Sequence, residues 1–238
     1  EIEAENLAEA EAEAAQEASA DAETPYRWNL SLLIITALAL LIGLLIADRI
    51  YRWNPLPKPQ DLRPTPGLTG IAGWLILIAI GITIRPLLSL YSIITTVASW
   101  DLETWLYITD PESEAYDPLF QIAGIFELLT FCLFLALDCV LLILFYQKRT
   151  SFPRVVIAYY IIWLVTSATC TLILEASEQF DRTLLPEFYS DIVRAVIQSL
   201  VWIPYFMVSI RVKQTFVERR REKIRNAVAT ENEDNIAG

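Results

Sequence analysis

Five long apolar stretches, separated by shorter polar ones, dominate the pattern of residues along the chain. A helix needs roughly 20 residues to cross about 30 Å of hydrocarbon. The stretches lack the alternating polarity that strands of a membrane barrel need, so each must satisfy its backbone hydrogen bonds as a helix. The pattern therefore predicts an all-α, polytopic integral membrane helix bundle. Its five transmembrane helices are expected at residues 30–47, 71–99, 122–146, 155–174 and 192–210.

The polar connections between these helices alternate in charge. The connections after the first and third helices are basic, as is the C-terminal tail, whereas the second connection has six acids and no base and the fourth has Arg182 among acids. Because Lys and Arg in short loops favour the cytoplasmic side, the charges predict an outer N-terminus and a cytoplasmic C-terminus. The bases are Arg49, Arg52, Lys58 and Arg63; Lys148, Arg149 and Arg154; and Arg211, Lys213, Arg219, Arg220, Arg221, Lys223 and Arg225.

The segments outside the helices differ in composition. Residues 1–29 form an acidic, Ala/Glu-rich tail, expected to be extracytoplasmic, and its first residue is Glu rather than Met, which indicates a processed or trimmed N-terminus. Residues 48–66 form a cytoplasmic linker with five prolines, which favour an extended chain. This linker is expected to be a stiff spacer that separates the first helix from a four-helix membrane core at 67–218. Residues 219–238 form a charged cytoplasmic tail.

The composition narrows the possible chemistry. The chain is 55% hydrophobic, above the roughly 45–50% of soluble domains. It has no histidine, the usual haem and metal ligand and the usual general base near neutral pH. Its three cysteines lie in apolar stretches without the spacing of a zinc site, and we expect them to be buried. Because no HExxH, GxSxG or P-loop pattern occurs, the sequence predicts no enzyme activity, no metal and no cofactor.

Four groups of residues across the core, in order and with matching spacing, resemble a bacterial four-helix inner-membrane family catalogued as a domain of unknown function (number twenty-five sixty-nine). The resemblance covers about residues 67–218 and implies a four-helix core with both ends in the cytoplasm, but it implies no activity. The first helix, the linker and the acidic tail lie outside it. The matching groups are residues 70–77 and 85–87; Phe126 and Glu127; Lys148, Arg149, Phe152 and Pro153; and Arg194, residues 202–206, Ser209, residues 211–213, Thr215 and Phe216.

Two bases and two acids lie within the apolar segments of this core. Arg85 is central in its segment, where an arginine costs at least about 2.5 kcal/mol and needs a partner. Glu127 and Asp138 are eleven residues apart and therefore share a helix face. From the expected depths we predict two interhelical ion pairs, Arg85 with Asp138 and Arg194 with Glu127. These pairs either fix the helix register, line a polar cavity for an ion, proton or small polar ligand, or face another subunit.

Small residues and prolines mark the same helices. Gly73 and Gly81 are eight residues apart, a spacing that would allow another helix to pack closely. Pro86 and Pro204 interrupt two of the expected spans, and each frees a carbonyl one turn earlier and permits a kink. We therefore expect close packing at the glycines and bends at the prolines.

The basic C-terminal stretch is a candidate for contact with lipid headgroups. Residues 211–228 are expected to continue the last helix, with seven bases among regularly spaced apolar residues. Such a helix can lie against anionic headgroups, each base adding about 1 kcal/mol, although a basic run at a membrane exit also acts as a topology determinant. Nucleic acid is a poor alternative partner. The candidate headgroup contacts are Arg211, Lys213, Arg219, Arg220 and Arg221.

These features favour a noncatalytic accessory or scaffold subunit of a larger protein complex in the bacterial inner (cytoplasmic) membrane. Its expected partners are membrane lipids and other membrane protein subunits. The alternative is a small transporter, channel or lipid-handling protein that uses the buried charges of the four-helix core. A water-filled or lipid-filled cavity that reaches those charges would favour the alternative, and a dry, closed bundle would count against it.

Overall fold

The computed structural model describes residues 27–53, 55–56 and 69–218, and within them the chain is all-α. Five helices are long and apolar enough to cross a membrane, which confirms the predicted multi-pass membrane bundle. The long helices are α2 (Leu30–Arg52), α3 (Trp74–Ser99), α5 (Pro118–Tyr146), α6 (Phe152–Ala176) and α7 (Leu185–Val208). The short elements are α4 (Leu102–Thr109), the 3-10 turn η2 (Arg182–Leu184) and α8 (Ile210–Thr215).

Local sequence sets where the long helices begin. The Asn29 side chain caps α2, because its Oδ1 accepts a hydrogen bond from the Leu32 amide at 3.1 Å. Proline stands in the first turn of α5, α6 and α7, where its missing N–H removes no helical hydrogen bond. The last span begins at Leu185 rather than at the predicted residue 192, and Pro186 lies in its first turn.

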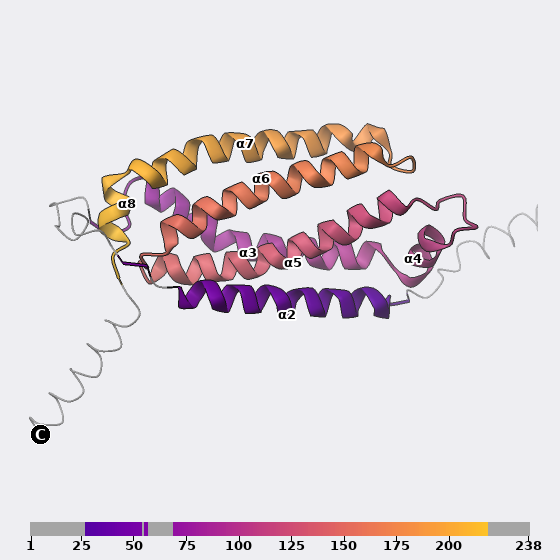
Figure 1. Cartoon of the computed structure of the whole chain (residues 1–238), viewed down its shortest axis with the longest axis horizontal. Coiled ribbons are helices and arrows are strands. Elements are labelled where there is room, and N and C mark those ends of the chain that lie inside the picture. Colours follow the sequence, from indigo (N-terminus) through magenta and orange to yellow (C-terminus); the bar gives the residue numbers. More distant parts are fainter. Residues whose placement is uncertain (1–26, 54, 57–68, 219–238) are drawn as a thin grey trace, which may run out of the picture.

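The central helix of the bundle is α5. Helices α2, α3 and α6 pack along it, whereas α7 packs along α6. In Figure 1 the helices lie nearly parallel, from α7 at the top, through α6, to α5 and α3, with α2 at the bottom. Helices α3 and α7 do not pack along each other. We call the two ends of the bundle the α4 end and the α8 end.

Small residues bring α2 against α5. The buried positions of α2 recur every third or fourth residue and so form one face. A Cβ added at Gly43 would lie 3.0 Å from the Ala136 Cβ and 3.3 Å from the Cys132 carbonyl oxygen, so a larger residue would push the helices apart. The first helix therefore packs directly on the four-helix core and is part of the five-helix bundle. The residues of this face are Leu32, Thr36, Ala39, Gly43 and Ala47.

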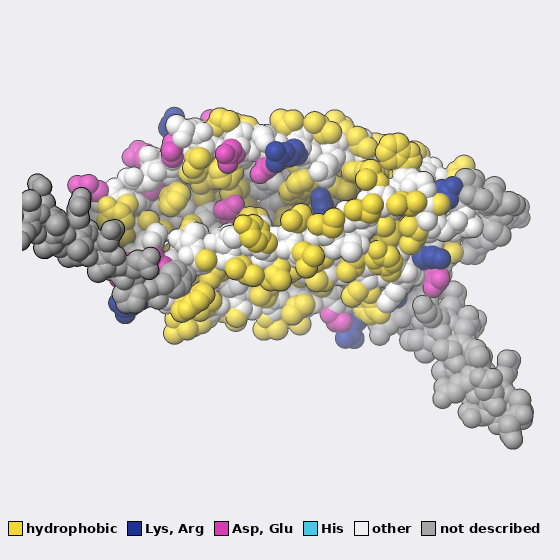
Figure 2. Space-filling view, turned by 180° about the vertical axis from the view of Figure 1, so that it is seen from behind, with side chains coloured by type: hydrophobic (Ala, Val, Ile, Leu, Met, Phe, Trp, Pro, Cys, Tyr) yellow, Lys and Arg dark blue, Asp and Glu magenta, His cyan; other side chains and the backbone are white. Residues whose placement is uncertain are grey.

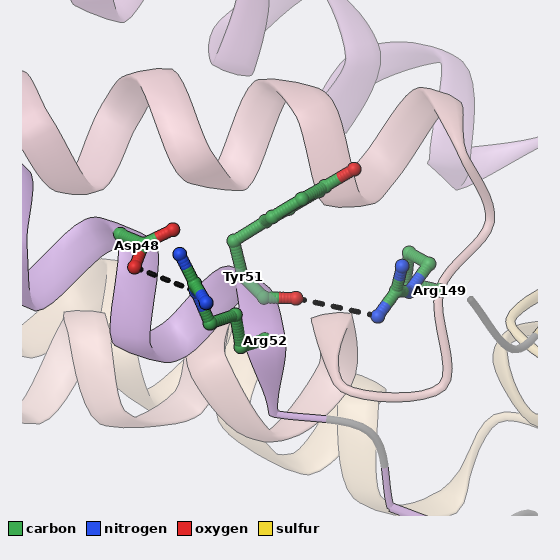
Figure 3. Close-up of polar contacts among 4 residues, drawn as sticks. All are labelled: Asp48, Tyr51, Arg52 and Arg149. Carbon is green, nitrogen blue, oxygen red and sulfur yellow. Dashed lines mark hydrogen bonds and ion pairs between the residues drawn. The ribbon is translucent and has the colours of Figure 1, made fainter. Parts of the chain in front are cut away.

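The C-terminal end of α2 is held by the loop between α5 and α6 (Figure 3). Arg149 Nη2 donates a hydrogen bond to the Tyr51 carbonyl at 3.3 Å, and the guanidinium lies 5.4 Å from the centroid of the Tyr51 ring. In the same turn of α2, Asp48 and Arg52 form an exposed ion pair at 2.7 Å. Arg149 is buried, so its side chain contributes to the packing of this end of the bundle as well as to its positive charge.

The last span does not continue into a basic surface helix. Ser209 has extended backbone angles (φ −62°, ψ 121°), ends α7 and begins the short α8. Val212 and Phe216 are buried, and the Phe216 ring stacks on Phe152 with the centroids 4.5 Å apart. The prediction of a continuous helix from residue 211 is therefore wrong in its described part, because these apolar side chains are buried in the α8 end.

The same end joins the beginning of the core to its end. Thr215 Oγ1 accepts a hydrogen bond from the Gly70 amide at 3.1 Å and donates one to the Gly70 carbonyl at 3.2 Å. Of the candidate headgroup contacts, Lys213 is exposed and Arg211 is half-buried. The other three, Arg219, Arg220 and Arg221, lie outside the described residues, as do nearly all of the acidic tail, most of the proline linker and the tail after residue 218.

At the α4 end, Asp117 ties α5 to α6. Its Oδ2 accepts hydrogen bonds from the Ser177 hydroxyl at 2.5 Å and from the Glu178 and Gln179 amides at 2.9 and 3.3 Å. Its Oδ1 accepts from the Leu119 amide at 2.8 Å and so caps α5. Burial acts to raise the pKa of this carboxyl, but the hydrogen bonds outweigh burial and hold the pKa below its ordinary value.

The charges of the described loops differ between the two ends. Acidic side chains gather at the α4 end, to the left in Figure 2. The basic loop between α5 and α6 lies at the α8 end, beside the bases of α8. This segregation matches the charge pattern from which the orientation was predicted, and the orientation itself stays a prediction.

Candidate functional site

A cavity of about 700 Å³ lies where α3 and α7 stay apart. Its walls come from α3, α5, α6 and α7, and Figure 2 shows this face hollowed between the upper and lower helices. Most of the lining is apolar. On the α3 side, Ile80, Ile84 and Leu88 are 54%, 47% and 58% exposed, so the cavity is open on the long side of the bundle. In a chain that spans the membrane, this side faces lipid, and we call the cavity the cleft.

Arg85 enters the cleft from the middle of α3. Its guanidinium lies over three aromatic rings of α6, at 4.7 Å from the centroid of Tyr159, 5.6 Å from Tyr160 and 5.1 Å from Trp163. Aromatic faces attract a cation, by roughly 2 kcal/mol where water is excluded. The rings therefore offset part of the cost of a positive charge within an apolar span.

One hydrogen bond of Arg85 crosses the cleft. Its Nη2 donates to the side-chain oxygen Oε1 of Gln198 in α7, at 3.3 Å. Because α3 and α7 do not pack along each other, this contact joins two helices that are otherwise separated at this level. Opening or closing of the cleft between α3 and α7 would therefore act directly on this bond.

Asp138 lies on the α5 wall of the cleft and is 1% exposed. Its Oδ2 accepts a hydrogen bond from the Ser89 hydroxyl of α3 at 2.6 Å, and the Tyr159 side chain lies close to the same carboxyl. Its Oδ1 is buried and meets no hydrogen-bond donor among the described residues. A buried acceptor without a donor costs about 1–3 kcal/mol, and more when it is charged. Asp138 therefore gives the wall of the cleft a carboxylate with one oxygen that makes no hydrogen bond with the described residues.

The predicted ion pair between Arg85 and Asp138 is not a direct one. Arg85 donates instead to Gln198, and Asp138 accepts from Ser89. Ser89, which holds Asp138, follows Arg85 by one helical turn, and residues so spaced have Cβ atoms about 5–6 Å apart. Arg85 and Asp138 therefore line the same cleft without forming a direct ion pair.

Glu127 lines a second cavity, of about 200 Å³, between α5, α6 and α7. Asp191 of α7 lines it too, so two acids face this space. The predicted pair of Glu127 with Arg194 is wrong, because Arg194 pairs instead with Asp191, one turn earlier on its own helix, at 2.9 Å. That pair is exposed, so the surrounding water lowers its contribution to stability.

The two cavities adjoin. Phe131, Phe134 and Trp163 line both of them. Glu127 and Asp138, which the sequence places on one face of α5, therefore lie in neighbouring spaces separated by aromatic side chains. Among the described residues, no group of three or more His, Cys, Asp or Glu is arranged to hold a metal ion.

Two sequence predictions about small residues need correction. Gly81 lies in the wall of the cleft, and a Cβ added there would meet nothing within 4 Å, so it does not bring another helix close. Gly73 has a φ of +58° and precedes α3, a conformation that favours glycine for backbone reasons. Cys132 and Cys170 are buried as predicted, but Cys139 is exposed.

Sequence reasoning missed the residues that surround the two charges. Ser89 offered a signal, because it is a polar residue one turn after Arg85. Gln198 offered a weaker one, as a polar residue within an apolar segment. The aromatic residues of α6 offered none, because such residues are ordinary in a membrane helix and their position over Arg85 is a tertiary contact.

A comparison with protein families adds to this geometry. The profile of a family described as "Protein of unknown function (DUF2569)" matches residues 68–217. The chain belongs to the DUF2569 family. In this DUF2569 protein, the matched range holds α3, α5, α6 and α7, and therefore every wall of the cleft. Helix α2 lies outside the match, although it packs on α5. Neither the curated proteins nor the solved structures contain a match to the chain.

Proposed function

We propose that this DUF2569 protein is a lipid-handling protein that takes a membrane amphiphile sideways into the cleft. The observation that carries the proposal is the cleft itself, open between α3 and α7 and reaching Arg85 and Asp138. Its apolar lining suits hydrocarbon chains, and the two charged side chains suit a polar group. An open cleft at these charges supports the alternative drawn from the sequence, because a closed bundle would have no such space.

The depth of the charges supports handling rather than passive contact with lipid. Arg85 follows the first residue of α3 by eleven positions, which at about 1.5 Å per residue is roughly 16 Å, about half of a 30 Å hydrocarbon core. A lipid that only surrounds the protein keeps its headgroup at the membrane surface. A polar site at this depth is instead suited to a molecule whose polar part moves into the bilayer.

The setting of this activity follows the charge pattern. We place the protein in the bacterial inner membrane, with the basic α8 end in the cytoplasm and the acidic α4 end outside. Membrane lipids are its partners in this proposal. The accessory or scaffold role in a larger complex, with other membrane subunits as partners, stays a prediction, because its support comes from the additional helix and the termini rather than from the cleft.

Native mass spectrometry of the full-length protein, purified in mild detergent, tests the proposal. Gly81→Phe places a large side chain in the cleft, where a Cβ meets nothing within 4 Å. Leu87→Phe is the matched control, because Leu87 is on the same helix, is 67% exposed and does not line the cleft. We expect Gly81→Phe to reduce the amount of co-purifying lipid by about tenfold, equivalent to about 1.4 kcal/mol, and Leu87→Phe to leave it unchanged.

Two results would contradict the proposal. One is a wild-type protein that carries no lipid after purification and gains none when lipid is added. The other is equal lipid binding by wild type and Gly81→Phe, because the bound lipid would then lie outside the cleft. Thermal unfolding of both variants, measured in parallel, checks that each is folded.

A further inference from the structure

The cleft presents two opposite charges that do not neutralise each other by direct contact. Arg85 comes from α3 and Asp138 from α5, and both line the same cavity. Asp138 is held by Ser89, one turn from Arg85, rather than by Arg85 itself. A bound molecule that met only one of these charges would leave the other facing an apolar space.

Arg85 is suited to an anionic group. The aromatic rings of α6 cover its guanidinium face, and Nη2 donates to Gln198 at its edge. A guanidinium has five N–H donors in one plane, an arrangement that matches the oxygens of a phosphate or carboxylate. The rings hold the plane in place, so an anion that enters the cleft meets a preoriented edge.

Asp138 is suited to a cationic group that carries N–H donors. Its Oδ2 already accepts from Ser89, whereas its Oδ1 is buried and makes no hydrogen bond with the described residues, although the Tyr159 side chain lies close to the same carboxyl. A primary ammonium supplies both a positive charge and N–H bonds, and hydrogen bonds between charged groups are the strong ones. A quaternary ammonium has the charge but no N–H to donate.

We infer that the cleft selects a zwitterionic lipid whose headgroup joins a phosphate to a primary ammonium, as in phosphatidylethanolamine. The phosphate meets Arg85 and the ammonium meets Asp138. The two-carbon link keeps the two charges of the headgroup close together, and Ser89, which holds Asp138, is only one turn from Arg85 on α3. The inference rests on the proposed lipid-handling function and adds the headgroup that the cleft recognises.

The acids and bases nearest to this site fit the same assignment. Asp138 is the acid among the residues that line the cleft, and Arg85 is the base. Glu127 and Asp191 belong to the adjoining cavity, beyond Phe131, Phe134 and Trp163. A purely anionic lipid would therefore bring its charge toward Asp138 without a compensating cation, and we expect it to bind less tightly.

The test titrates the delipidated full-length protein in detergent with three lipids of identical acyl chains: phosphatidylethanolamine, phosphatidylglycerol and phosphatidylcholine. Binding is measured by native mass spectrometry. We expect phosphatidylethanolamine to bind about tenfold more tightly than either of the others, the effect of one hydrogen bond between charged groups. Because the comparison is between ligands, it needs no variant that might fail to fold.

The variant Asp138→Asn tests whether Asp138 is the residue that selects the headgroup. This variant keeps the shape of the side chain but removes its charge, so we expect it to lose the preference for phosphatidylethanolamine while binding of phosphatidylglycerol is retained. Arg85→Gln is expected to weaken all three lipids, because each has a phosphate. Gly81→Phe, which fills the cleft, is expected to remove the preference as well.

The outcomes separate the headgroup inference from the proposed function. Equal binding of the three lipids by the wild type, or tighter binding of phosphatidylglycerol, overturns the zwitterion inference and leaves lipid handling in place. A preference that persists in Asp138→Asn also overturns it. Binding of none of the three overturns both.

Discussion

The two sides of α5 are packed differently. On one side, small residues of α2 lie directly against Cys132 and Ala136, so the interface is closed and apolar. On the other side, α3 and α7 stay apart and leave a cleft that contains Arg85 and Asp138. Lipid tails are as apolar as leucine, so helices associate in a membrane through close fit and hydrogen bonds rather than through the hydrophobic effect. The α2 side uses close fit, whereas on the cleft side α3 and α7 each pack on a neighbouring helix and meet at the level of Arg85 through its hydrogen bond to Gln198.

The α2 side and the cleft therefore differ in what a substitution changes: stability at the first, and binding at the second. At the α2 side a larger residue must move a backbone or a neighbouring side chain, and stability falls. At the cleft a larger residue enters open space, and only the capacity for a bound molecule falls. The same residue type, glycine, allows the two sides to be compared directly.

The largest expected effect comes from Gly43→Leu, with Gly81→Leu as its matched control. Both replace a helical glycine, but a Cβ at Gly43 would lie 3.0 Å from the Ala136 Cβ, whereas a Cβ at Gly81 meets nothing within 4 Å. We expect Gly43→Leu to lower the free energy of unfolding by about 3 kcal/mol, the upper part of the range for overpacking. Gly81→Leu should leave it unchanged or raise it, because glycine weakens a helix. Equal effects in thermal unfolding would show that the two sides do not differ.

The next largest effect is expected at the α4 end, where Asp117 holds α5 to α6. Asp117→Ala should lower the free energy of unfolding by about 2 kcal/mol, because charged hydrogen bonds are lost. In the wild type, the folded pKa of Asp117 lies below its ordinary value of 3.8, so its stabilising contribution is present above about pH 3.8 and is lost as the pH falls through the folded pKa. Acid unfolding curves of both proteins measure this contribution, and it should be missing from Asp117→Ala. Parallel curves would contradict the assignment.

A smaller effect is expected when the contact across the cleft is removed. In Gln198→Ala, Arg85 loses the acceptor that it reaches in α7, so we expect a loss of about 1 kcal/mol in stability and faster exchange of bound lipid. Thr95→Val is the control on α3, because the Thr95 hydroxyl bonds only within its own helix. Lipid exchange followed by native mass spectrometry should rise in Gln198→Ala and not in the control. An unchanged exchange rate would mean that the bond does not restrain the cleft.

The smallest effect is expected for a charge outside the cleft. Lys213 is exposed at the α8 end, and a base near an anionic surface contributes about 1 kcal/mol or less. Lys213→Gln should therefore reduce the number of phosphatidylglycerol molecules bound in excess lipid, without altering the preference for phosphatidylethanolamine. A lost preference would mean that lipid selection occurs at the end of the bundle rather than at Arg85 and Asp138.

Much of the fold was predictable because it depends on local chemistry. The five spans follow from apolar length, and the starts of α5, α6 and α7 follow from prolines in their first turns. Arg85 and Asp138 were also identifiable, because a charged side chain within an apolar membrane segment is costly and is rarely present without a structural or functional role. Arg194 was misassigned since sequence depth suggested Glu127, whereas a nearer acid, Asp191, lies on the same helix. The break at Ser209 was missed because the buried positions of Val212 and Phe216 depend on α5 and α6.

The sequence alone was enough to predict five helices long and apolar enough to cross a membrane, joined by loops that alternate between basic and acidic. The helices were predictable because each must satisfy its own backbone hydrogen bonds in hydrocarbon, and the loop charges are read directly from the residues. Only the tertiary structure decided that Gly43 lies in a tight interface and Gly81 in an open cleft, and that Arg85 meets the rings of α6. Close fit between helices depends on side chains far apart in the sequence, and no single segment contains that information.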